Sequence, residues 1–177
     1  MILVAGIGNI FLGDDGFGSE AARLIAGRIS SPDVKVVDFG IRGLDFVYAL
    51  MDGYDATIMI DAVQRGRDPG TVYVIEPDLG EIEDPAGGID AHIMDPLRVL
   101  ALARSMGADL SNVVLVGCEP QTFGDPGEGR LGLSPGVAAA LDRACRLVEV
   151  LIHRMSHARA FNCVEHHRDR GRAVGEA

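Results

Sequence analysis

Four aspartates and one histidine have the residue types and spacing of a divalent metal site. Asp14 and Asp15 follow a glycine-rich turn, and Asp38 and Asp61 each end an apolar run. His92 follows a long acidic segment. Carboxylate oxygens and an imidazole nitrogen form a ligand set suited to borderline ions such as nickel, zinc or cobalt. The sequence therefore predicts a metal site, provided that the fold brings these side chains together.

The paired acids at 14 and 15 argue against a phosphate-binding loop. The turn before them is Gly6-Ile7-Gly8-Asn9, between an apolar run and a helical period. A G-x-G-x-x-G motif beginning at Gly6 would need glycine in place of Phe11, and no G-x-x-x-x-G-K-[ST] motif is present. Because carboxylates repel a phosphate, a cation is the expected ligand.

The apolar pattern indicates which elements must position these residues. Short apolar runs predict five strands, and segments of helical period lie between most of them. The predicted strands are 2–5, 34–37, 57–60, 71–75 and 113–118. Residues 62–70 are too few for a crossover helix, so the fourth strand should be antiparallel to the third and at an edge. The pattern predicts an α/β fold: a three-layer α/β/α sandwich with a five-stranded, mostly parallel sheet and one antiparallel edge strand.

In such a sheet the candidate ligands converge. The carboxyl ends of parallel strands meet at one edge, where open α/β sheets bind ligands. Asp15, Asp38 and Asp61 should all lie there, and His92 begins a helix whose N-terminus faces that edge. Each residue also has a simpler interpretation. Asp14 and Asp15 could cap a helix, Asp38 and Asp61 could cap the loops that follow, and His92 could be a surface residue.

A serine motif near the C-terminal helix has no predicted catalytic role. Residues 132–136 match G-x-S-x-G, in which the backbone N–H after the serine forms the oxyanion hole. Here that residue is Pro135, which has no N–H. Ser134 is therefore expected to cap the last helix.

Composition narrows the classes of function and the organisation of the chain. Residues 1–154 are predicted to form one domain, and the polar, arginine-rich residues 155–177 a mobile tail. The net charge of −10 argues against a nucleic-acid partner. Three cysteines without a C-x-x-C pair indicate a reducing compartment. With neither a signal peptide nor an apolar run long enough to insert into a membrane, we expect a cytoplasmic protein.

Five motifs in order resemble the hydrogenase maturation protease family. They are G-I-G-N-I-F-L-G-D-D-G-F-G at 6–18, D-F-G-I-R-G at 38–43, I-D-A at 60–62, D-A-H at 90–92 and G-L-S-P at 132–135. The resemblance covers about residues 1–152. It implies an endopeptidase that removes the C-terminal peptide of a [NiFe] hydrogenase large-subunit precursor after nickel insertion.

The resemblance also implies roles for individual residues. The family's metal ligands fall on Asp15, Asp61 and His92, and the nickel is expected to be carried by the precursor. Asp38 is a candidate for contacting the peptide or supporting a ligand. The family's G-G-T-like run after that aspartate is replaced here by residues 39–42, which bears on the choice of hydrogenase. The alternatives are a metal-dependent hydrolase with its own metal and a non-catalytic, flavodoxin-like binding module.

Overall fold

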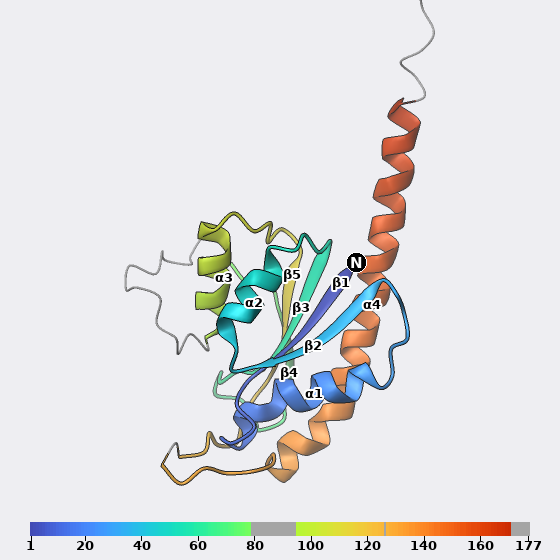
Figure 1. The fold of residues 1–177 in the computed structure, drawn as a ribbon. Helices are drawn as coiled ribbons and strands as arrows, with labels where there is room; N and C mark the ends of the chain where they lie inside the picture. Colours follow the sequence, from blue (N-terminus) through green and yellow to red (C-terminus); the bar gives the residue numbers. More distant parts are fainter. Residues whose placement is uncertain (79–94, 126, 171–177) are drawn as a thin grey trace, which may run out of the picture.

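A twisted sheet of five strands forms the centre of the molecule (Figure 1). The computed structural model describes the backbone of residues 1–78, 95–125 and 127–170, and side chains in these ranges up to residue 157. The strands are β1 (Ile2–Ile7), β2 (Val34–Gly40), β3 (Ala56–Ala62), β4 (Val72–Ile75) and β5 (Val113–Cys118). Their order across the sheet is β2-β1-β3-β5-β4.

Helices cover both faces of the sheet, which confirms the predicted three-layer sandwich. They are α1 (Phe17–Ala26), α2 (Gly43–Leu50), α3 (Pro96–Ser105) and α4 (Pro135–Arg170), with a short 3-10 turn, η1 (Asp14–Gly16), before α1. One apolar cluster packs α1 and α4 against the sheet, and a second packs α2 and α3 against the other face. Neighbouring residues of one strand divide between these clusters, since strand side chains alternate in direction. In β1, Val4 faces α1 and α4, and Leu3 faces α2 and α3.

The fourth strand is antiparallel and lies at the edge, as predicted. Its neighbour is β5 and not β3, because β5 enters the sheet between them. The other neighbouring pairs, β1 with β2, β1 with β3 and β3 with β5, are parallel. The carboxyl ends of β1, β2, β3 and β5 therefore lie at one edge of the sheet, together with the beginning of β4.

The last helix is longer than the sequence predicted. The tail was expected to begin at residue 155, but α4 continues to Arg170. The apolar stripe ends at Met155, the last side chain packed on the core among those described. A helix that has already formed propagates at little cost, so it need not stop where its apolar face stops. Within the described part of the chain, no helix has both the length and the apolar character to cross a membrane.

Removing the end of α4 should have little effect on stability. We expect a chain that ends after Met155 to melt within about 2–4 °C of the full chain, the shift that 1 kcal/mol produces at this size. A chain that ends after Leu147 is the control, because it loses the buried Val148 and the partly buried Leu151 and Ile152. A fall of ten degrees in the first variant would mean that the distal helix stabilises the domain.

Candidate active site

Two of the predicted ligands, Asp15 and Asp61, lie near each other at the carboxyl edge of the sheet. Asp61 is the sixth residue of β3 and is only 6% exposed. Its Oδ1 accepts a hydrogen bond of 2.8 Å from the backbone N–H of Ala62. Asp15 lies in η1, and its Oδ2 accepts one of 2.8 Å from the backbone N–H of Asn9. Neither Asp14 nor Asp15 caps α1, whose N-cap position is Gly16.

Burial and mutual repulsion make it costly for both of these carboxyls to be ionised. Burial, and then the nearby charge of Asp15, raises the pKa of Asp61 well above its usual range. Burial also raises the pKa of Asp15, against the opposing effect of the Asn9 N–H. A cation between them would offset the repulsion, so the pair is chemically suited to one.

Gly8 allows the turn after β1 to approach both carboxylates. Its φ is 122°, in the region that favours glycine. A Cβ at this position would lie 1.8 Å from the carbonyl oxygen of Asp15 and 3.5 Å from Oδ1 of Asp61. Any side chain at position 8 would therefore collide with η1. Glycine allows the turn after β1 to pack directly against it.

Asp38 lies on the other side of this turn and is fixed by hydrogen bonds. Its Oδ1 is 2.7 Å from the Ser19 hydroxyl and accepts a bond of 3.0 Å from the backbone N–H of Gly40. The same hydroxyl is 3.2 Å from the carbonyl oxygen of Gly8. Asp38 itself is exposed. Ser19 thus ties the end of β2 to the turn that supports Asp15 and Asp61.

We expect Ser19→Ala to loosen this connection without unfolding the protein. The buried hydroxyl is lost, and one hydrogen bond contributes about 1 kcal/mol, so the melting temperature should fall by about 2–4 °C. Ser105→Ala is the matched control, since its exposed hydroxyl bonds only within α3. Equal melting temperatures for the two variants would show that Ser19 contributes no more than a surface serine.

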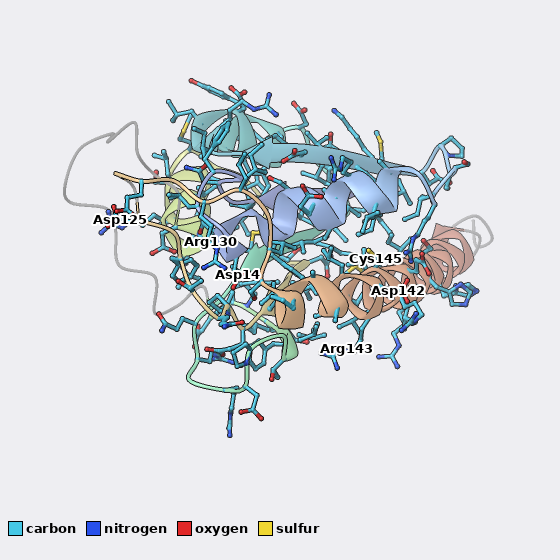
Figure 2. All side chains as sticks on the ribbon, turned by 90° about the horizontal axis from the view of Figure 1, so that it is seen from below. Asp14, Asp125, Arg130, Asp142, Arg143 and Cys145 are labelled. Atoms are coloured by element: carbon cyan, nitrogen blue, oxygen red, sulfur yellow. The ribbon has the colours of Figure 1, made fainter. Side chains whose placement is uncertain are left out.

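Asp14 is fully buried and holds two distant segments together. Its Oδ2 accepts bonds from the backbone N–H groups of Gln121 (2.8 Å) and Thr122 (3.1 Å), and its Oδ1 accepts one of 2.6 Å from Ser134. Figure 2 shows Asp14 beside the start of α4. Burial alone would raise the pKa of Asp14, but these hydrogen bonds outweigh it and lower the pKa. The sequence analysis missed this role because the partners are 107 to 120 positions away.

Ser134 precedes α4 as predicted, but its hydroxyl has another partner. The hydroxyl donates to Oδ2 of Asp14 at 3.0 Å. The residue is 2% exposed. A hydroxyl so buried and so engaged is not available as a nucleophile, in agreement with the argument from Pro135.

Glu119 is a third buried carboxylate, and the sequence analysis did not identify it. It accepts hydrogen bonds from the backbone N–H groups of Arg65 and Gly66 at 2.9–3.0 Å, and from the hydroxyl of Tyr73. Burial opposes ionisation, but these donors together lower its pKa, and burial and Glu119 raise the pKa of Tyr73 to about 12. The sequence signal that could have identified Glu119 is its position directly after β5, at the same edge of the sheet as Asp61.

The predicted third ligand, His92, lies outside the described residues. Asp95 begins the next described segment and caps α3, with its Oδ1 accepting a 2.9 Å bond from the N–H of Leu97. The charge of Asp95 also contributes to the raised pKa of Asp61, so the N-terminus of α3 lies toward the site. Among the side chains that the structure describes, no group of three His, Cys, Asp or Glu could hold a metal. The described part of the predicted site is thus the pair Asp15 and Asp61.

Comparison with known proteins shows the family of this chain. The family model described as hydrogenase maturation protease matches residues 20–150. The chain belongs to the hydrogenase maturation protease family. The match begins within α1 and ends within α4, so it includes Asp38 and Asp61 but not η1.

Several relatives of this maturation protease are similar over most of their length. A putative hydrogenase maturation protease of Methanocaldococcus jannaschii is 33% identical over 150 residues, which are 83% of this chain and 93% of the relative. The hydrogenase expression/formation protein HupD of Rhizobium leguminosarum is 33% identical over 149 residues, which are 83% of this chain and 73% of HupD. The solved structure of the hydrogenase maturating endopeptidase HybD from E. coli has a TM-score of 0.71 and 27% identity, covering 86% of this chain and 92% of HybD.

Family membership settles the broad class of this maturation protease. It is a hydrolase that acts on peptide bonds, with the five-stranded, mostly parallel sheet of its structural relatives. The alternative of a non-catalytic, flavodoxin-like module is therefore set aside. The ligand roles of Asp15, Asp61 and His92, and the role of Asp38, stay predictions.

Proposed function

We propose that this protease removes the C-terminal peptide of a [NiFe] hydrogenase large-subunit precursor, and that it recognises the nickel already inserted there. The observation that carries this proposal is the pair Asp15 and Asp61 at the carboxyl edge of the sheet. Burial raises the pKa of both, and the nearby charge of Asp15 raises that of Asp61 further, so a bound cation would stabilise the ionised pair. In the proposed reaction, the nickel of the hydrogenase precursor would be this cation.

The chain's own residues would act mainly by binding and positioning. In the proposed complex, Asp15 and Asp61 supply oxygen ligands to the precursor's nickel, and His92 supplies a nitrogen. Protein ligands that leave positions open allow the ion to keep ligands from the precursor. The shared ion would then hold the adjoining peptide against the sheet edge. Because bound ligands must be deprotonated, the raised pKa of Asp61 would make docking stronger as the pH rises.

Asp38 has a place in this proposal next to the peptide. It is exposed at the same edge, and the Ser19 hydroxyl and the Gly40 N–H fix the direction of its carboxylate. A carboxylate held in this way can accept a hydrogen bond from a peptide N–H of the precursor. The loop that follows, residues 41–42, leads directly into α2 and would border the same peptide.

The deciding experiment compares nickel-loaded with nickel-free precursor. Purified protease is incubated with each, and the mass of the precursor is measured to detect loss of its C-terminal peptide. We expect cleavage of the loaded form alone. Equal cleavage of both forms, dependent on metal added to the protease, would favour a hydrolase with its own metal. No cleavage of any loaded precursor would contradict the proposed function.

A further inference from the structure

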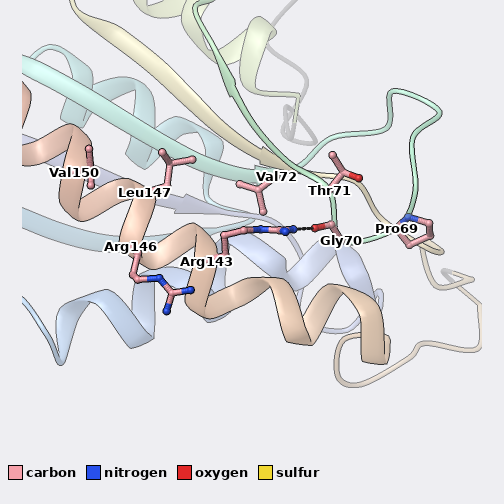
Figure 3. Close-up of a pocket in the computed structure, with 8 residues that line it drawn as sticks. All are labelled: Pro69, Gly70, Thr71, Val72, Arg143, Arg146, Leu147 and Val150. Carbon is pink, nitrogen blue, oxygen red and sulfur yellow. Dashed lines mark hydrogen bonds between the residues drawn. The ribbon is translucent and has the colours of Figure 1, made fainter.

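The edge strand β4 is bordered by a groove that the proposed site does not use. The groove has a volume of about 650 Å³ and lies between the start of β4 and α4 (Figure 3). Its lining includes Gly70, Val72, Arg143, Arg146, Leu147 and Val150. The start of β4 pairs with the end of β5, so this groove opens close to the carboxyl edge that holds Asp15 and Asp61.

The outer side of β4 presents backbone groups that can pair with another strand. Among the described residues, no strand pairs with this side. The N–H of Glu119 donates to the carbonyl of Thr71, so residues 71, 73 and 75 form the hydrogen-bonded pairs with β5. The backbone groups of Val72 and Val74 therefore point away from the sheet. Such groups are a template for an added strand.

The floor of the groove is apolar and partly open. Val72 packs on the core cluster beneath α4, and Val74 lies on the same face of β4 with 47% of its surface exposed. Leu147 also packs on that cluster, while Val150 is 48% exposed. An added strand could place alternate apolar side chains against these residues.

Arginines lie on both faces of this edge, although the protein as a whole carries a net charge of −10. On the α4 face, Arg143 donates to the carbonyl of Gly70, as Figure 3 shows, and Arg146 pairs with Asp142. On the opposite face, the guanidinium of Arg65 lies 5.8 Å from the ring centre of Tyr73.

The basic character is confined to the groove itself. Of the described residues that line it, Arg143 and Arg146 carry charge and none is acidic. Asp142 is shared between Arg146 and Arg28, and Glu119 is buried behind backbone donors. Asp68 lies in the loop before β4, and Glu76 and Asp78 follow the strand, outside the groove. The groove would therefore attract an acidic segment, although the edge as a whole is not basic.

We propose that an extended, acidic segment of the precursor pairs with the free edge of β4 and places apolar side chains in the α4–β4 groove. This inference rests on the proposed function for the identity of the partner. Backbone pairing supplies affinity that is independent of side chains, while the arginines and the groove select acidic residues alternating with apolar ones. The nickel and this second contact would hold the precursor at two separate points.

One test uses a synthetic probe and does not depend on protease activity. The probe is acetyl-Val-Glu-Val-Glu-Val-Glu-amide, and its counterpart replaces each glutamate with lysine. We expect the acidic peptide alone to bind and to slow hydrogen exchange at the Val72 and Val74 amides. Arg146→Glu should weaken binding by about tenfold or more, as should Val150→Asp, which places a charge on the apolar floor. The matched control is Arg23→Glu, a helix arginine that pairs with a neighbouring acid on α1.

A second test uses the nickel-loaded precursor as substrate. Arg146→Glu should raise KM by about tenfold and leave kcat unchanged, because Arg146 lines the groove and pairs with Asp142, not with Asp15 or Asp61. An unchanged KM would overturn the docking site while leaving the proposed function intact. If the wild-type protein cleaves no precursor, the proposed function fails, and the peptide binding still decides whether the edge accepts an acidic strand. Dimerisation with protection of β4 in the free protein would assign the edge to a second copy and overturn the proposal.

Discussion

Asp61→Asn should reduce processing of nickel-loaded precursor by about 100-fold or more. Residues that merely support metal ligands contribute about 10–100-fold to metal affinity or activity, and a ligand should contribute at least as much. The substitution keeps the shape of the side chain and its acceptor for the N–H of Ala62. It removes only the charge, so the loss would be electrostatic in origin. The measurement is the rate of C-terminal cleavage followed by mass spectrometry.

The same variant should be as stable as the wild-type protein at neutral pH, or more stable. The folded state raises the pKa of Asp61 above the value of about 4 that an aspartate has in the unfolded chain. As the pH rises above about 4, ionising Asp61 therefore lowers the stability of the folded protein. Asparagine does not ionise, and the variant avoids that cost. Its advantage in melting temperature should therefore shrink as the pH falls toward that value. Full processing by Asp61→Asn at the wild-type rate would contradict the shared-metal site.

Asp15→Asn is the companion variant, since its side chain is the other member of the pair. We expect the same loss of processing. His92→Ala tests the ligand that lies outside the described residues, and Asp52→Asn, at an exposed aspartate in the turn after α2, is the control for nonspecific effects of charge. Loss in both Asp15→Asn and His92→Ala, with normal processing by Asp52→Asn, would support one ion shared by three ligands.

Asp14→Ala should destabilise the protein more than any other single loss of a carboxylate discussed above. The substitution removes the acceptor for the N–H groups of Gln121, Thr122 and Ser134. A buried donor left without a partner costs about 1–3 kcal/mol, so the total should reach about 3 kcal/mol or more. For a chain of this size that corresponds to a fall in melting temperature of about 6–12 °C.

Asp125→Ala is the matched control for this variant. Asp125 lies in the same loop as Thr122 and accepts one N–H, from Gly127, but it is exposed. Water can replace its carboxylate, and the expected change is below about 1 kcal/mol. Because the folded state lowers the pKa of Asp14, its contribution is present above about pH 4 and is lost as the pH falls further. A difference between wild type and Asp14→Ala that does not narrow at acid pH would contradict the proposed charge-assisted bonds.

Local periodicity predicted the elements of the fold well. The strand Val113–Cys118 was predicted with its observed bounds, and α4 begins at Pro135 as its Ser-Pro start indicated. The direction of β4 followed from the length of the connection before it. The insertion of β5 between β3 and β4 did not follow, because strand order depends on contacts between segments far apart in sequence. The predicted end of α4 was wrong. The apolar stripe shows only how far the helix packs on the core, whereas the helix itself can continue beyond it on local propensity.

The positions of site residues could be predicted where those residues lie at strand ends. They could not be predicted where long-range contacts hold the residues. Asp61 and Asp38 could be placed at one edge because parallel strands share a direction. The roles of Asp14 and Asp15 could not be distinguished by sequence, although Asp14 is held by hydrogen bonds to distant segments and Asp15 lies near enough to Asp61 to raise its pKa. The difference arises from donors on the segment before α4, which no local pattern connects to η1.

The strand order also has a consequence for how the protein emerges from the ribosome. When β3 and β4 have been synthesised, neither has its final partner on the side where β5 belongs, because β5 lies about forty residues further along the chain. Until then the sides of β3 and β4 that will pair with β5 have no partner. Asp14 gains its full set of hydrogen bonds later still, because the N–H donor of Ser134 must first be translated. The edge that carries Asp15 and Asp61 is thus completed only after Ser134 has been translated, and a chain released before that point would lack this bond to Asp14.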